Sequence, residues 1–121
     1  MNSGRGYYFG TEIGGKWWRR YRRDGLFARG LGEYRYDDRA FYFQRKLSGN
    51  VIRIEFAAVE DIRTGRWHAG RWGAGAPVIK FIWKKDDLTL SSGFLLSRNR
   101  EEAARIIEDI VRRWRATRSR S

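Results

Sequence analysis

The chain has 121 residues and a formal net charge of +12, with 41% hydrophobic and 16% aromatic residues, so its length predicts one domain and its composition argues against disorder. The absence of cysteine excludes disulfides, a thiolate nucleophile and cysteine-ligated metal centres. No apolar run approaches the roughly 18 residues of a membrane-spanning helix and no hydrophobic signal segment opens the chain, so we expect a cytoplasmic protein without a transmembrane segment.

The N-terminal residues have the composition of an arm. Residues 1–6 are small and polar, and residues 10–15 are rich in turn-forming residues. The aromatic run at residues 7–9 between them is either a strand or an anchor. We expect residues 1–15 to form a flexible N-terminal arm.

A dense cluster of aromatic and basic residues follows. Residues 16–23 read KWWRRYRR, the most unusual local composition in the chain. On a helix, Trp17 and Tyr21 share one face at i,i+4 spacing. We expect residues 16–24 to form an additional helix packed against the outside of the domain.

The middle of the chain has the pattern of short strands joined by tight turns. Alternation is clearest at residues 51–56, where Ile52, Ile54 and Phe56 share one face. Consecutive strands with short connections pair antiparallel. The segments expected to be strands are residues 26–36, 39–47, 51–56, 59–67, 78–84 and 88–96.

Residues 99–114 have the pattern of one amphipathic helix. Asn99 can cap its N-terminus, and Glu102 can reach back to the capping backbone N–H. A lone helix of this length is marginal in water, so its apolar stripe needs a sheet to cover, with Trp114 inserted into the core. The stripe consists of Ala103, Ile106, Ile107, Ile110, Val111 and Trp114.

These elements together predict an α+β domain. An open sheet of this size cannot hide a large core on both faces, so we expect an antiparallel β-barrel or half-barrel of six to seven strands. The C-terminal helix would cap one end of it. The domain is expected to span residues 16–115, with a disordered tail at residues 116–121.

Several segments between Gly32 and Trp114 have the pattern and spacing of a known superfold. They are EYRYDDRAFYF, VIRIEF, AAVEDI, VIKFIWKKDDLTL, SSGF and EEAARIIEDIVRRW. This layout, over about two thirds of the chain, resembles the pleckstrin-homology-like (PH-like) superfold and, within it, small bacterial PH-like and GRAM-type domains. The resemblance implies a half-barrel closed by a helix. Phosphoinositide-binding members carry basic residues at the first hairpin loop, where this chain has Asp37 and Asp38, so the resemblance does not imply that ligand.

The stretch at residues 16–23 is the first candidate site for an anionic ligand. Tryptophan suits the headgroup level of a membrane, and each base near an anionic surface adds roughly 1 kcal/mol. Nucleic acid is an alternative, because arginine neutralises phosphate and aromatic rings stack on unpaired bases. A protein partner and a solvated face of a helix pinned by tryptophan are further alternatives. The candidate residues are Lys16, Trp17, Trp18, Arg19, Arg20, Arg22 and Arg23.

The loop at residues 66–76, RWHAGRWGAGA, is the second candidate site. Arg66, Arg71 and Trp72 are its candidate ligand-contacting residues. The alternative is a long strand connection whose tryptophans close one end of the barrel. Its glycines lack the surroundings of a phosphate-binding motif.

The sequence indicates no catalytic, metal or cofactor site. His68 is the only histidine, so a metal site would need a carboxylate-rich set of ligands. Adjacent acids in a strand, as at residues 60–61, point to opposite faces, and residues 86–87 have the pattern of a hairpin turn. We therefore expect no enzyme, no cofactor and no metal, with a small enzyme as the least favoured alternative.

The sequence predicts a non-catalytic binding module. The isoelectric point of about 10.8 favours anionic partners, although arginine enrichment at solvated positions also occurs without any partner. The expected partner is an anionic membrane surface or another protein, with peripheral association with the membrane in the first case. Nucleic-acid binding through arginine and Trp/Tyr stacking is the alternative.

Overall fold

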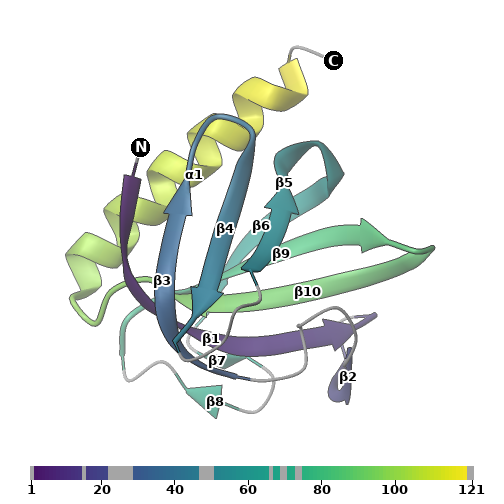
Figure 1. The fold of residues 1–121 in the computed structure, drawn as a ribbon, viewed down its shortest axis with the longest axis horizontal. Coiled ribbons are helices and arrows are strands. Elements are labelled where there is room, and N and C mark those ends of the chain that lie inside the picture. The colour runs from purple at the N-terminus through teal and green to yellow at the C-terminus, as the bar shows by residue number, and fades with distance from the viewer. Residues whose placement is uncertain are drawn as a thin grey trace.

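The structure is a computed structural model that describes residues 2–14, 16–21, 29–46, 51–65, 67–68, 71–72 and 75–119. At residues 17, 18, 67, 68, 71 and 72 it describes the backbone alone. The described residues form strands, one 3₁₀ turn (η1) and one α-helix (Figure 1). In chain order these are β1 (Asn2–Ile13), β2 (Lys16–Arg20), β3 (Gly30–Tyr36), β4 (Ala40–Arg45), β5 (Val51–Glu55), η1 (Phe56–Ala58), β6 (Val59–Gly65), β7 (Trp67–His68), β8 (Arg71–Trp72), β9 (Val78–Lys85), β10 (Leu88–Leu95) and α1 (Arg100–Ser119).

One eight-stranded antiparallel sheet forms the body of the fold. Seven strands follow the order β5–β4–β3–β1–β10–β9–β6, and β2 adds to β1. Apart from the insertions β2 and β7–β8, strands that follow one another in sequence pair, except β5 and β6, and β10 returns to pair with β1. The sheet is strongly bent but not closed, because β5 and β6 are its two end strands (Figure 1). This confirms the predicted α+β half-barrel, which is compatible with a PH-like half-barrel.

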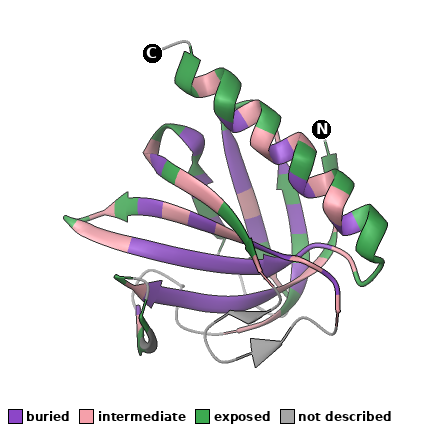
Figure 2. Ribbon diagram, turned by 180° about the vertical axis from the view of Figure 1, so that it is seen from behind, coloured by how far each residue is buried: buried purple, intermediate pink, exposed green. Residues whose placement is uncertain are grey.

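Aromatic side chains fill the inside of the half-barrel. Strand alternation turns every second residue inward, and Figure 2 shows the resulting bands of buried residues. The ring of Phe94 lies at the centre, 4.8 Å from Phe41 and 5.3 Å from Phe43 between centroids. The ring of Tyr8 lies 5.1 Å and that of Phe81 5.9 Å from the same ring.

A chain of polar side chains crosses this aromatic core. The Tyr8 and Thr11 hydroxyls are hydrogen-bonded at 2.5 Å, and those of Thr11 and Ser92 at 2.7 Å. Trp83 Nε1 donates to Ser92 Oγ at 3.0 Å. Burial raises the pKa of the Tyr8 phenol against the opposing hydrogen bond from Thr11, so the group stays neutral at physiological pH. Each buried polar atom of this chain therefore has a partner, as a dry core requires.

Helix α1 covers one side of the half-barrel as its periodicity predicts. Ala103, Ile107, Ile110 and Trp114 are buried against the sheet. Trp114 Nε1 donates to the Val59 carbonyl at 3.0 Å, which anchors the helix at the start of β6. The insertion of Trp114 into the core is thus confirmed.

The predicted cap at the start of α1 is present, with one difference. Asn99 Oδ1 accepts a hydrogen bond from the Glu102 N–H at 2.9 Å, as in a standard N-cap. The Asn99 N–H donates to Ser97 Oγ at 3.1 Å. The sequence predicts that the Glu102 carboxylate accepts a hydrogen bond from the Asn99 N–H, but Ser97 accepts it instead.

A partly buried ion-pair network joins the C-terminal half of α1 to the β3–β4 hairpin. Asp109 Oδ2 accepts from Tyr36 OH at 2.9 Å and from Arg113 Nε at 3.1 Å. Arg113 Nη1 also donates to Asp38 Oδ1 at 2.7 Å. Burial alone would raise the pKa of Asp109, but the hydrogen bonds from Tyr36 and Arg113 outweigh it and lower that pKa below its ordinary value. The acidic hairpin turn therefore has a structural role, and Asp37 closes it through the backbone N–H groups of the next residues.

The Asp109→Asn variant is expected to lower the free energy of unfolding at neutral pH by about 1–2 kcal/mol, because the charged acceptor of the hydrogen bonds from Tyr36, Arg112 and Arg113 is lost. The folded-state pKa is depressed, so the stabilisation is fully present above the unfolded value of about 4 and disappears as the pH falls through the folded value. Urea unfolding of both proteins from about pH 7 to about pH 2.5 measures the difference. A difference that does not shrink at acid pH would contradict this charge-based account.

The prediction of a flexible arm at residues 1–15 is wrong for most of its length. Residues 2–13 form β1, which pairs with both β3 and β10 at the centre of the sheet. The small residues serve close packing: a Cβ on Gly4 would collide with the Tyr34 ring, and one on Gly6 with the Leu95 carbonyl. The ordered sheet therefore begins at Asn2.

The predicted helix at residues 16–24 is also wrong. Residues 16–20 form β2, which pairs antiparallel with the distal half of β1. β3 covers β1 only from Asn2 to Tyr8, so the remaining edge of β1 is free to take a strand. This pairing overrides the helical spacing of the aromatic residues. Residues 22–24 lie outside the described part.

The expected disordered tail at residues 116–121 is helical as far as Ser119. α1 continues past Trp114 because two hydroxyls support its last turns: Thr117 Oγ1 donates to the Arg113 carbonyl and Ser119 Oγ to the Arg115 carbonyl, both at 3.1 Å. Thr117 also contacts the Asp38 carbonyl at 3.1 Å. Residues 120–121 lie outside the described part.

Candidate functional site

The two segments singled out from the sequence come to the same side of the molecule. β2 carries KWWRR, and the short hairpin of β7 and β8 carries WH and RW. In Figure 1 both lie at the end opposite α1, with β2 paired to β1. Some fifty residues of chain separate them. Both parts of the chain in which tryptophan and arginine are adjacent in sequence therefore lie at this end of the molecule.

The described side chains of β2 differ in exposure. Lys16 and Arg19 are exposed to solvent. Arg20 is half-buried, and its guanidinium lies against Gly10, where any Cβ would collide with it. Gly10 also has a φ of 111°, a conformation that favours glycine. Lys16 and Arg19 are therefore accessible to a ligand, whereas Arg20 packs on the sheet.

The remaining predicted site residues stay predictions. Arg22, Arg23 and Arg66 lie outside the described residues. At four further positions the structure places the backbone in a strand and describes no side chain; these are Trp17, Trp18, Arg71 and Trp72.

Further bases near this end come from β6 and β9. Alternation in β9 turns Ile79, Phe81 and Trp83 inward, so Lys80 and Lys84 face outward. The two lysines are visible in the segment VIKFIWKK, but its apolar residues predict a buried strand and draw attention away from them.

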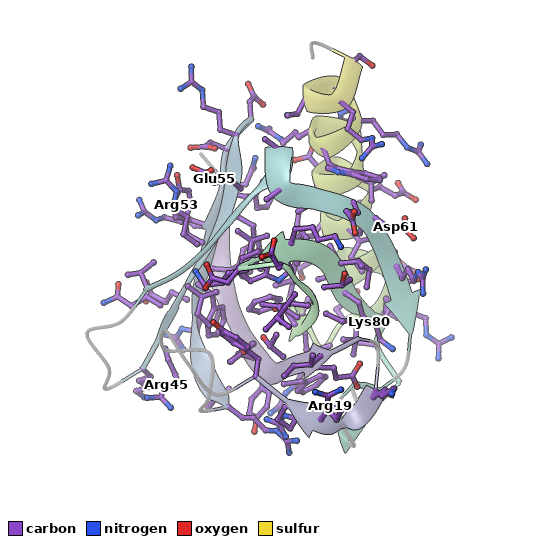
Figure 3. The ribbon with its side chains drawn as sticks, turned by 90° about the vertical axis from the view of Figure 1, so that its right-hand side faces the viewer. Arg19, Arg45, Arg53, Glu55, Asp61 and Lys80 are labelled. Carbon is purple, nitrogen blue, oxygen red and sulfur yellow. The ribbon has the colours of Figure 1, made fainter. Side chains whose placement is uncertain are left out.

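Register brings one more base to the same face. Arg63 of β6 lies opposite Lys80 of β9, and like charges in this position repel. The Arg63 Nε to Asp61 Oδ2 distance is 3.0 Å, so this acid offsets one of the bases. Figure 3 shows Arg19, Asp61 and Lys80 on one side of the molecule. We call the bases of this region the basic end: Lys16, Arg19, Arg63, Lys80 and Lys84.

The acidic residues considered as catalytic or metal-binding candidates lie in an ion pair and a turn. Asp61 pairs with Arg63, and the register shifts between Val59 and Asp61. Asp86 and Asp87 form the β9–β10 turn, both with positive φ. Among the described residues, no group of three or more His, Cys, Asp or Glu side chains is placed to hold a metal ion.

Comparison with known proteins gives no family. No family model matches the chain, and no curated protein has a similar sequence. Within the described part, no helix has the length and apolar character needed to cross a membrane.

Proposed function

We propose that the protein is a non-catalytic binding module that associates peripherally with anionic membrane surfaces through its basic end. The observation that supports this most strongly is the position of both β2 and β7–β8 at the end of the molecule opposite α1, although they are far apart in sequence (Figure 1). The bent sheet and its closing helix also support the proposal that the chain is a PH-like or GRAM-type domain.

The distribution of charge supports the choice of this end. Lys16 and Arg19 are exposed, and each base close to an anionic surface contributes roughly 1 kcal/mol of attraction. At the other side of the molecule, Arg112 and Arg113 of α1 both pair with Asp109, and Arg113 also pairs with Asp38. Two of the six arginines of α1 therefore already pair with acids within the fold.

Reversing two charges of the basic end is expected to weaken binding to anionic vesicles at least tenfold, because each replacement removes an attraction and adds a repulsion. The variant is Lys16→Glu/Arg19→Glu, both exposed. The matched control is Arg105→Glu/Arg115→Glu, which makes the same change in net charge on the exposed side of α1. Vesicle flotation measures the bound fraction, and circular dichroism verifies that the fold is retained.

Equal loss of binding in the two variants would contradict the proposal, because it would show that net charge alone drives the association. Single-stranded DNA is added as a competitor in the same assay. Release of the wild-type protein from vesicles by the DNA at moderate salt would also contradict the proposal and assign the basic end to nucleic acid.

A further inference from the structure

The end strand β5 presents an unpaired edge in the described part of the chain. It pairs with β4 in one continuous register without a bulge, and no described strand pairs with its other side. The opposite end strand, β6, has a register shift between Val59 and Asp61, and such bulges are a common protection of sheet edges. Of the two end strands in the described part of the chain, β5 is therefore the one without a bulge.

The hydrogen-bond pattern shows which backbone groups point to this edge. The Phe56 N–H donates to the Arg39 carbonyl at 2.8 Å. Hydrogen-bonded pairs alternate along an antiparallel ladder, so Ile52 and Ile54 direct their backbone groups to β4. The N–H and C=O groups of the alternate residues point to the open side; these residues are Val51, Arg53 and Glu55.

The same three residues place their side chains on the outer face of the sheet. Val51 is 45% exposed, and it and Leu31, at 55%, are the exposed large hydrophobic residues of the described part. The Arg53 guanidinium is 5.8 Å from the centre of the Tyr42 ring. Arg53 Nη2 and Glu55 Oε1 are 2.8 Å apart. Figure 3 shows Arg53 and Glu55 together along this edge, away from Arg19.

We propose that two copies of the chain associate through β5, antiparallel and edge to edge, about a two-fold axis perpendicular to the sheet. In this register Arg53 lies opposite the partner's Glu55, and Glu55 lies opposite the partner's Arg53. All of these residues direct backbone groups to the shared edge, so the hydrogen bonds are reciprocal. The outer faces of both copies, with Val51 and Tyr42, then lie on the same side.

The charges of Arg53 and Glu55 favour this register and favour a second copy of the chain as the partner. Centring the axis on Arg53 would put that arginine opposite the partner's Arg53, which is repulsive. The segment Arg53-Ile54-Glu55 is complementary to itself when it runs antiparallel, so a second copy supplies the required charges without any change of sequence. A five-residue edge buries less than the roughly 1,200–2,000 Å² of stable dimers, so the association is weak and depends on concentration.

Charge reversal tests this interface by sedimentation velocity over a range of protein concentrations. The wild-type protein is expected to show a concentration-dependent dimer. Arg53→Glu and Glu55→Arg are each expected to weaken it at least tenfold, because like charges then face each other across the axis. The double variant Arg53→Glu/Glu55→Arg is expected to restore it.

A mixture of the two single variants is the most demanding arm of this experiment, because each variant supplies the charges that the other lacks. The mixture is expected to associate although each variant alone does not. The control is Arg63→Glu on the other end strand, which should leave the dimer unchanged. A wild-type protein that is monomeric at all concentrations, or single variants that dimerise as the wild type does, would overturn the proposal. Loss of the dimer in Arg63→Glu would overturn it as well, by assigning the contact to β6.

Discussion

Replacing Phe94 with alanine is expected to lower the free energy of unfolding by about 3–5 kcal/mol. Phe94 is fully buried in β10, where β10 crosses the middle of the bent sheet. Its ring contacts others from both halves of the sheet, with the centroid of Phe41 of β4 at 4.8 Å and that of Phe81 of β9 at 5.9 Å. Removing the ring leaves a cavity inside the bent sheet. This cavity can close only if the curvature of the sheet changes.

Urea unfolding followed by tryptophan fluorescence measures this effect. The control is Leu31→Ala at an exposed position of β3, where the change should stay within about 0.5 kcal/mol. Phe94→Leu, which retains most of the volume, should give an intermediate loss. A loss below about 1 kcal/mol in Phe94→Ala would contradict the central position of this ring in the core.

Trp114→Ala is expected to lower the free energy of unfolding by about 3–5 kcal/mol through two separate contributions. The indole is buried at the seam, close to η1, where α1 meets the start of β6. Its Nε1 donates to the Val59 carbonyl at 3.0 Å, and truncation leaves this acceptor only the longer hydrogen bond from Arg118 Nη1 at 3.4 Å. The half-barrel then loses the anchor of its closing helix.

Trp114→Phe separates the two contributions. This variant retains an aromatic ring in the core and removes only the hydrogen-bond donor. Its free energy of unfolding should therefore be about 1–2 kcal/mol lower than that of the wild type. The exposed neighbour Arg115→Ala is the control and should be close to neutral. Equal losses in the phenylalanine and alanine variants would show that packing of the ring contributes nothing, contrary to the structure.

The helix and the half-barrel could be predicted because their signals are local. The stripe from Ala103 to Trp114 repeats at the helical period, and the alternation at Ile52 and Ile54 repeats at the period of a strand. The helix end extended further than expected, since hydroxyl side chains such as Thr117 support it through backbone contacts that periodicity does not report.

The N-terminal elements could not be predicted because their structure depends on partners distant in sequence. Gly4 and Gly6 have the composition of a flexible arm, yet their small size is what permits contact with Tyr34 and the Leu95 carbonyl. The helical spacing in residues 16–23 is genuine but is overridden by the free edge of β1. Only the strand pairing of the folded sheet shows that both segments are strands and not an arm and a helix.

The candidate site was found in part. Lys16 and Arg19 were named from local composition and are exposed, whereas Arg20 was named for the same reason and packs against Gly10. Lys80 and Lys84 were missed, because their importance comes from the neighbouring strands and not from the apolar segment in which they occur. Local composition indicates charge, but the sheet decides which charges are close to one another.

Flotation of the wild-type protein with anionic and with neutral vesicles, at low and at high salt, tests the membrane proposal most directly. We expect binding to anionic vesicles alone, weakening as salt screens the basic end and persisting in the presence of single-stranded DNA. Equal binding to neutral and anionic vesicles, or no binding to either at low salt, would contradict it.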